Sequence, residues 1–320
     1  MSRSHAVADP WLTVIMPCYR GEQWIDSALG SIALGSADGI EVLVIDSSPT
    51  SAARDIASRY SDKLQLRIMD RPDLLSWHHK TNVGVQLARS RHVCWLHVDD
   101  LWFPDRAASI SKWIEAAPQA SLHLAPSAII DGNGRSLGVW RCPLPKDQAL
   151  PSSLVIERLL VQNFIAAPAP VFRRDAWIAA GGLDETLWYT GDWDIWLKLA
   201  ATGPVYYHDV VTTGFRIHPG SLTVTGSRDV SEFAQQHQTV LDRHLSRAGA
   251  HSRRIGRAAR ASVSINTALA AASAGDFGRL FGATLDVLGL GPMGIHRYVR
   301  DSRIMDRLMA RIRARFAGAL

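Results

Sequence analysis

Short apolar runs alternate with amphipathic segments along the first hundred residues. Four of the runs have the length and the continuous apolar character of strands that are buried on both faces. They span residues 12–17, 41–46, 64–69 and 92–98. The segments between them, 22–34, 51–60 and 80–90, carry apolar residues at helical spacing. This alternation predicts a mainly parallel sheet flanked by helices, an α/β fold whose ligands bind at the carboxyl ends of the strands.

The pattern changes in the middle of the chain. Residues 120–142 are typical of two strands joined by the turn sequence Asp-Gly-Asn-Gly, which favours a hairpin. Helical spacing returns in 151–163 and 191–203, and a strand, a helix and a glycine stop are predicted within 169–185. From about residue 230 onward the pattern is almost entirely helical and rich in alanine and arginine.

Three predicted strands end in polar residues, at 17–21, 46–49 and 97–100. Right-handed crossovers would bring these ends to one crevice at the edge of the sheet. The chain has no GxGxxG after its first strand and no GxxxxGK[ST] anywhere. These absences disfavour a dinucleotide site and a phosphate-binding P-loop.

Composition narrows the class of protein. Of 320 residues, 47% are hydrophobic and 20% are charged, as in globular proteins. The three cysteines form no metal-binding or disulfide pattern, which favours a reducing compartment. The first residues lack the apolar run of a signal peptide, and no segment reaches the roughly 18 apolar residues of a membrane span. We therefore expect a cytoplasmic protein.

Charge is distributed unevenly around a net value of +5. From Arg247 to the end there are 13 arginines, no lysines and four aspartates, a net charge of +9, which leaves −4 for the first 246 residues. A basic end on a mildly acidic body predicts two functional regions.

Adjacent carboxylates, Asp99 and Asp100, follow the fourth predicted strand. Paired carboxylates at a strand end suit a divalent cation, since Mg²⁺ or Mn²⁺ binds one or two carboxylates together with substrate phosphates. Capping of the helix that begins near Pro104 is the alternative. Capping explains one aspartate but not both, so we favour a metal site.

A second acidic pair, Asp192 and Asp194, opens the predicted helix at 191–203. Aspartate is favoured in the first turn of a helix by capping and by the helix dipole, so at least one of the two has a structural explanation. The tryptophans and tyrosine nearby suit either sugar stacking or a core. His218 follows a strand-like run, and is either structural or a ligand of metal or phosphate.

Six segments in order carry a resemblance to a known family. They are TVIMPCYRGEQWIDSALGSI, EVLVIDSSP, TNVGVQLARSRHVCWLHVDDLW, VFRRDAWIAAGGLDE, GDWDIWLKLA and FRIHPGSLT. From about residue 11 to 225 the chain resembles a GT-A glycosyltransferase of family 2. The resemblance implies a GT-A domain at 11–228, with a nucleotide-binding half at about 11–104 and an acceptor half at about 105–228. Residues 229–320 would form a basic helical C-terminal region.

The resemblance also implies a reaction and a set of site residues. The donor would be a nucleotide-diphospho-sugar, most often a UDP-sugar, and transfer would invert the anomeric carbon with the help of Mg²⁺ or Mn²⁺. Asp99 and His218 match the metal ligands, and Asp192 matches the base that deprotonates the acceptor hydroxyl. The positions expected to contact the nucleotide-sugar are Pro17, Tyr19, Asp46, Asn82, His97 and Asp100.

Several positions depart from the family pattern. His97 replaces the first acid of the DxD motif, Gly191 replaces the glutamate before the base, and Thr81 stands where many members have an arginine, for which His79 or Lys80 would substitute. Asp192 is retained, so we expect an active enzyme.

The end of the chain predicts a basic amphipathic helix. Ile304, Leu308, Ile312 and Phe316 lie four residues apart among arginines. Such a helix either lies on an anionic membrane surface or packs on its own domain with its arginines in solvent. The first option would place the enzyme peripherally at the inner face of the membrane, where a glycan or lipid-linked glycan acceptor would be found. No recognition module supports nucleic-acid binding.

Two other functions compete with glycosyl transfer. A sugar-phosphate nucleotidyltransferase also uses an α/β sheet and Mg²⁺, but it needs a glycine-rich basic loop after the first strand, which residues 17–24 do not provide. A catalytically idle sugar-nucleotide-binding or scaffolding subunit would explain the altered DxD and the missing glutamate. The favoured hypothesis is an inverting transferase in bacterial polysaccharide or glycolipid biosynthesis.

Overall fold

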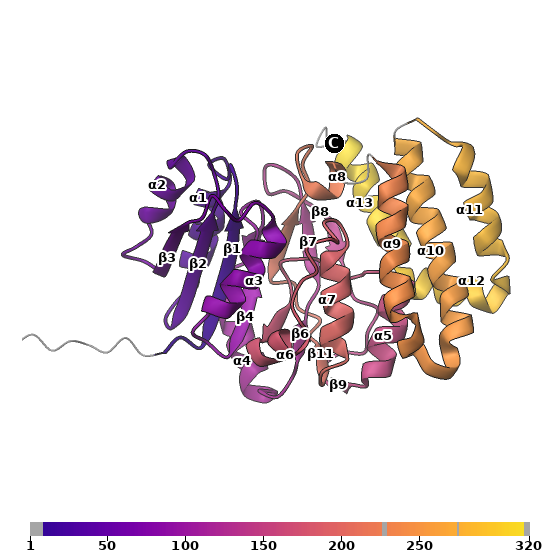
Figure 1. Cartoon of the computed structure of the whole chain (residues 1–320), viewed down its shortest axis with the longest axis horizontal. Coiled ribbons are helices and arrows are strands. Elements are labelled where there is room, and N and C mark those ends of the chain that lie inside the picture. Colours follow the sequence, from indigo (N-terminus) through magenta and orange to yellow (C-terminus); the bar gives the residue numbers. More distant parts are fainter. Residues whose placement is uncertain (1–8, 226–228, 274, 317–320) are drawn as a thin grey trace, which may run out of the picture.

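Four parallel strands form the first half of the main sheet in the computed structural model, which describes residues 9–225, 229–273 and 275–316 (Figure 1). The strands are β1 (Leu12–Cys18), β2 (Ile40–Asp46), β3 (Gln65–Asp70) and β4 (His92–Trp95), in the order β3-β2-β1-β4. They are connected by the helices α1 (Ile25–Ala33), α2 (Ala52–Ser58) and α3 (Trp77–Leu87). The predicted α/β arrangement is confirmed.

Two boundaries differ from the prediction for physical reasons. Helix α3 begins at Trp77 rather than at residue 80, because the Ser76 side chain caps it by accepting a hydrogen bond from the His79 N–H. Strand β4 ends at Trp95, so the polar residues that follow leave the sheet as a turn, in which the Asp100 N–H donates to the carbonyl of His97. Asp99 and Asp100 therefore lie beyond the sheet edge.

The second half of the main sheet is mixed. Strands β10 (Val171–Arg173) and β9 (Ala149–Leu150) run antiparallel to their neighbours, whereas β6 (Leu122–Leu124) and β11 (Val205–Tyr207) are parallel to each other. The helices in this half are α4 (Arg106–Ala116), α5 (Ser152–Val161), α6 (Arg174–Ala179) and α7 (Gly191–Ala200).

A second, four-stranded sheet includes the strand that follows the carboxyl end of β4. It has the order β5-β12-β7-β8, with β5 (Leu101–Trp102), β12 (Thr213–Arg216), β7 (Ser127–Ile130) and β8 (Ser136–Trp140). The predicted hairpin is confirmed for β7 and β8, whose turn is held by Asp131 Oδ1 accepting from the N–H groups of Asn133 and Arg135. Its first expected strand is instead divided at Ala125–Pro126, because proline has no N–H to donate to a ladder. β6 and β7 consequently lie in different sheets.

Helices follow to the end of the described chain. They are α8 (Leu222–Thr225), α9 (Val230–His244), the 3₁₀ segment Leu245–His251, α10 (Ser252–Ser273), α11 (Gly278–Leu288), α12 (Gly291–Ser302) and α13 (Ile304–Phe316). Figure 1 shows α9 and α10 beside α7 and α5, with α11 and α12 at the outer edge. The expected boundary at 228/229 adjoins residues 226–228, which lie outside the described residues. None of the described helices is long and apolar enough to cross a bilayer.

The predicted amphipathic helix at the end of the chain packs on its own domain. Ala310 of α13 is buried against Ile129 and Leu137, and the Arg313 guanidinium donates to the carbonyl of Leu137 at 3.0 Å. Met305 and Met309 remain exposed on α13. The Phe316 side chain lies outside the described residues.

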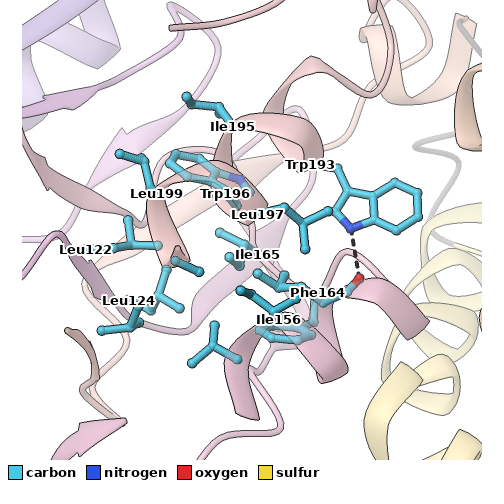
Figure 2. Packing of buried hydrophobic residues seen from close by; sticks show 14 of the residues in the cluster. Leu122, Leu124, Ile156, Phe164, Ile165, Trp193, Ile195, Trp196, Leu197 and Leu199 are labelled. Carbon is cyan, nitrogen blue, oxygen red and sulfur yellow. Dashed lines mark hydrogen bonds between the residues drawn. The ribbon is translucent and has the colours of Figure 1, made fainter. Parts of the chain in front are cut away.

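Buried apolar side chains cover both faces of the main sheet. On β1, Ile15 packs into one cluster and Val14 and Met16 into the other, as a strand buried on both faces requires. Figure 2 shows part of the first cluster, where the Trp193 indole N–H donates to the carbonyl of Leu159 at 2.8 Å. Trp196 stacks on Trp95 with ring centroids 4.8 Å apart. These tryptophans of α7 are core residues.

Asp194 is the central charge of the contact between α7 and α9. It is fully buried, with Lys198 Nζ at 2.6 Å, Arg243 Nη1 at 2.9 Å and His244 Nε2 at 2.7 Å. Burial raises the pKa of this carboxyl, but hydrogen bonds from His244 and Lys198 outweigh burial and lower it to about 2. Of the acidic pair at the start of α7, Asp194 is therefore structural, as an ion-pair partner rather than a cap.

We expect Asp194→Asn to lower the free energy of unfolding by about 3–5 kcal/mol, because it removes the buried counter-charge that Lys198, Arg243 and His244 all contact. Urea unfolding followed by circular dichroism measures this. The matched control is Asp175→Asn, which breaks an exposed ion pair with Arg173 and should cost under about 1 kcal/mol. Equal losses in the two variants would contradict the central role of Asp194.

Candidate active site

A cavity of about 580 Å³ opens at the carboxyl edge of the main sheet. Its wall is made by the ends of β1 and β4, by β12 and the residues after it, by the start of α7, and by α9, α10 and α13. The structure brings most of the sequence-predicted residues together in this wall. They are Pro17, Tyr19, His97, Asp99, Asp100, Asp192 and His218.

Asp99 and His218 form the centre of one side of the cavity. His218 Nε2 lies 3.2 Å from Asp99 Oδ2, and both side chains are partly exposed to the cavity. The His218 imidazole packs against the Trp24 ring, with the two ring centroids 5.1 Å apart. Burial raises the pKa of Asp99, but the hydrogen bond with His218 and the nearby His97 outweigh burial, so the net shift is downward. Asp99 is therefore ionised at neutral pH.

Asp100 and Arg216 hold the backbone of this side of the cavity in place. The Arg216 N–H donates to Asp100 Oδ1 at 2.9 Å, and its guanidinium donates to the carbonyl oxygens of Asp99, Asp131 and Gly132 at 2.6–2.9 Å. Asp100 Oδ2 has no hydrogen-bond partner among the described residues, although His97 Nδ1 lies 3.8 Å away. Burial and the charge of Asp99 raise the pKa of Asp100 well above its usual value.

The pair at the cavity wall suits a divalent cation. Two ligands at about 2.1 Å in neighbouring octahedral positions lie about 3.0 Å apart, close to the 3.2 Å between Asp99 Oδ2 and His218 Nε2. The described residues contain no group of three or more His, Cys, Asp or Glu side chains placed to hold a metal. A cation here would take at most a few ligands from the protein and the rest from substrate phosphates and water, as Mg²⁺ commonly does.

Asp192 lies at another part of the same wall, on the first turn of α7. Its Oδ2 accepts from Asn163 Nδ2 at 3.1 Å, and its Oδ1 accepts from the N–H of Trp193 at 2.7 Å. Burial raises the pKa of Asp192 to about 6, although these two hydrogen bonds oppose the shift. A carboxylate with this pKa is ionised at pH 7 and is basic enough to accept a proton from a hydroxyl as it reacts.

Two predicted residues do not line the cavity. Asp46 is fully buried, with Oδ1 accepting from the Ser48 N–H and hydroxyl and Oδ2 paired with Arg54 at 2.7 Å. Asn82 forms two hydrogen bonds with the backbone of Leu183 and so ties α3 to the loop after α6. In the structure both side chains hold backbone in place.

Three residues of the cavity wall are absent from the site predicted from the sequence, or appear there only as a substitute for an arginine: Lys80, Arg216 and Asn163. Lys80 is buried, donates from Nζ to the carbonyl of Cys18 at 2.8 Å and lies 5.7 Å from the centre of the Tyr19 ring. Arg216 stands two residues before His218, and this proximity was the available signal. Asn163 ends the segment predicted as a helix, and nothing in its sequence context indicates a contact with Asp192.

Comparison with known proteins identifies the domain. The model of Glycosyl transferase family 2 matches residues 13–149, a segment that contains Pro17, Tyr19 and the Asp99–Asp100 turn. Residues 13–149 therefore match glycosyltransferase family 2. This identification confirms the resemblance predicted from the six segments.

Solved structures show that the chain has the GT-A fold. S. aureus TarS 1-349 in complex with UDP-GlcNAc is similar with a TM-score of 0.65 and 17% identity, covering 96% of this chain and 92% of that one. The mannosyltransferase PcManGT from Pyrobaculum calidifontis, in complex with GDP-Man and Mn²⁺, gives a TM-score of 0.55 at 18% identity, over 95% and 86% of the two chains. Another S. aureus TarS structure is longer, and the match covers 43% of its chain.

Sequence relatives are also glycosyltransferases by name. An uncharacterized glycosyltransferase of Rickettsia prowazekii (strain Madrid E) is 22% identical over 234 residues, which cover 71% of this chain and 70% of the relative. The amylovoran biosynthesis glycosyltransferase AmsE of Erwinia amylovora is 26% identical over 168 residues, which cover 52% of this chain and 60% of that protein.

Packing around Gly191 leaves no room for a side chain. A Cβ atom on Gly191 would lie 2.5 Å from His78 Nε2 and 2.7 Å from its Cδ2. The buried imidazole of His78, whose pKa burial lowers to about 4, thus occupies the space that a side chain at position 191 would need. Glycine at 191 and histidine at 78 are therefore coupled by packing.

We expect Gly191→Ala to destabilise the protein by about 1–3 kcal/mol, because the added methyl group overlaps His78. Combined with His78→Ala, the same change should cost less than the sum of the two single variants, since the smaller side chain makes room for it. Denaturant unfolding of the wild type, both single variants and the double variant measures the coupling. Additive costs within about 0.5 kcal/mol would show that the two positions do not compete for space.

Proposed function

We propose that the chain is an inverting, metal-dependent glycosyltransferase that moves a sugar from a nucleotide-diphospho-sugar to an acceptor hydroxyl. The observation that carries the proposal is one cavity in which the Asp99–His218 pair and the raised-pKa carboxylate Asp192 both take part. The first suits a diphosphate leaving group with its cation, and the second suits an acceptor hydroxyl that loses its proton. A single base is what a one-step displacement with inversion needs.

The donor would bind along the ends of β1 and β4. The Tyr19 ring is 52% exposed and offers a stacking face for a nucleotide base, while Lys80 brings a positive charge beside it. We favour a UDP-sugar, since TarS binds UDP and UDP-GlcNAc, although PcManGT binds GDP-Man. Asp46 stays a proposed base contact, and in this role it would exchange a hydrogen bond to Ser48 for one to the base.

The leaving group would be stabilised at Asp99 and His218. A bound Mg²⁺ or Mn²⁺ would neutralise the charge that develops on the diphosphate as the anomeric bond breaks. Asp99 supplies an ionised oxygen to this position and His218 supplies a ring nitrogen. Arg216 and the buried Asp100 fix the backbone of Asp99, and His97 lines the wall next to them.

The acceptor would be a sugar hydroxyl of a bacterial polysaccharide or a lipid-linked glycan. The cavity wall near Asp192 includes the partly exposed ring of Tyr189, whose face suits the apolar face of a sugar ring. Amylovoran biosynthesis by AmsE supports a polysaccharide product by relationship.

The decisive experiment measures donor binding and hydrolysis over UDP-, GDP- and dTDP-sugars, with and without Mn²⁺. We expect one donor class to bind only with the metal. Asp99→Ala should abolish this binding, and Asp192→Asn should bind the donor but turn it over about 10²–10⁴-fold more slowly. The exposed Asp62→Asn serves as the matched control and should behave as the wild type. Metal-dependent binding without turnover in the wild type would instead favour the idle subunit, and no binding at all would refute the proposal.

We also propose that the enzyme acts in the cytoplasm, at the inner face of the membrane, and that α11 rather than α13 makes the contact. Phe277, Phe281, Leu285 and Leu288, at and along α11, are 51–74% exposed. Large exposed apolar side chains on an amphipathic helix, within a region of net charge +9 from Arg247 onward, suit an anionic bilayer surface.

Phe281→Ser together with Leu285→Ser should weaken binding to vesicles of phosphatidylglycerol and phosphatidylcholine by at least about tenfold, because each loses its buried apolar area in the bilayer. Co-sedimentation with the vesicles measures the affinity. The control is Leu34→Ser, because Leu34 is 80% exposed at the end of α1, a helix that Figure 1 shows at the opposite end of the molecule from α11. Equal binding of the wild type, the double variant and Leu34→Ser would exclude α11 as the contact.

A further inference from the structure

We infer that helix α10 of the C-terminal region is part of the catalytic machinery, because Ser262 and Asn266 hold Gln162 and thereby fix the loop whose Asn163 orients Asp192. The inference rests on the proposed role of Asp192 as base. It makes Asn163 a positioning residue, and Gln162, Ser262 and Asn266 the groups that place it.

The contact between Asn163 and Asp192 has a defined direction. Asn163 Oδ1 accepts from the N–H of Ile165 at 3.2 Å, which leaves its NH₂ group as the part of the amide that faces Asp192. Asn163 Nδ2 then donates to Asp192 Oδ2 at 3.1 Å, while Trp193 N–H donates to Oδ1. Each carboxylate oxygen therefore has one fixed donor and keeps lone pairs for the acceptor hydroxyl.

Gln162 connects this loop to α10. It follows the last residue of α5 in an extended conformation and is 6% exposed. Its Oε1 accepts from Ser262 Oγ and from Asn266 Nδ2, each at 2.8 Å, and its Nε2 donates to the carbonyl of Asn163 at 3.3 Å. Two donors on one buried oxygen fix the side chain, so the backbone at Asn163 is held from α10.

These contacts lie outside the part of the chain that identifies the family. The family match ends at residue 149, and the sequence resemblance ends near 225, whereas Ser262 and Asn266 are about 100 residues from Gln162. Asn266 also lines the cavity together with Asp192 and Asn163. The C-terminal helices therefore reach the reacting centre itself, beyond forming its outer wall.

The test follows the ionisation of Asp192. Because its folded pKa is about 6, wild-type kcat/KM for hydrolysis of the donor found above should rise with pH through about 6 and then level off. Loss of the amide donor in Asn163→Ala removes a hydrogen bond that favours the ionised form, so the midpoint should move up by about one pH unit. Asn163→Asp, of nearly the same volume, should move it further because it adds a like charge.

Two further variants address α10. Gln162→Leu and Asn266→Ala should move the midpoint in the same direction by a smaller amount and lower kcat, with the donor Kd unchanged. Ser264→Ala, on the same helix and away from the cavity, should match the wild type in every readout. Thermal unfolding of each variant shows whether it is folded at the temperature of the assay.

A second readout needs no turnover. Carbon-13 NMR of the aspartate carboxyls, with Asp192 assigned by its loss in Asp192→Asn, reports the same pKa directly. Unchanged midpoints in Asn163→Ala by NMR would overturn the role of Asn163, and Asn266→Ala behaving as Ser264→Ala would overturn that of α10. If the NMR shifts appear but the wild type turns over no donor, the positioning contacts stand and the proposed function fails.

Discussion

The guanidinium of Arg216 is the contact on which the arrangement of the site depends. It binds the backbone oxygens of Asp99, Asp131 and Gly132, and so joins the turn after β4 to the hairpin turn of the second sheet. Its own N–H holds the buried carboxylate of Asp100. Without the guanidinium, the carbonyl oxygens of Asp99, Asp131 and Gly132 would lose a shared donor, and leaving buried polar groups unpaired is costly. Arg216 thereby fixes the backbone of Asp99, whose carboxylate lies 3.2 Å from His218.

Burial acts on three carboxylates of this region with different results. Asp194 is the most enclosed, yet three donors keep its pKa at about 2 and make it a fixed counter-charge. Asp192 has two neutral donors and no cation, so burial prevails and its pKa rises to about 6. Asp99 lies between, because burial raises its pKa while the hydrogen bond with His218 and the nearby His97 lower it, with a net downward shift. The number of cationic donors thus explains why Asp194 has a low pKa and Asp192, only two residues away, has a raised one.

The sequence predicted those parts of the fold that depend on local pattern. Continuous apolar runs located the strands around β1, and adjacent aspartates after β4 located the centre of the cavity. Contacts between distant segments left no such pattern. Asn163 at the end of a helix, or His78 beside Gly191, is an ordinary residue until the fold brings its partner within reach. Asp46 is a further case, since its family-motif position could be read from the sequence, whereas its bonds to Ser48 and Arg54 could not.

The charge and periodicity of the sequence predicted that the C-terminal helices form a separate basic region. In the structure, their contacts make them part of the same domain as the two sheets. Asp194 binds Arg243 and His244 of α9, Gln162 binds Ser262 and Asn266 of α10, and β8 packs against α13. These are three independent attachments on different helices, and two of them adjoin the cavity. Helix α10 holds Gln162 and also packs against α11, which carries the exposed apolar side chains. A surface that engages α11 is therefore one helix away from Gln162, so the proposed membrane contact and the proposed base would be connected through α10.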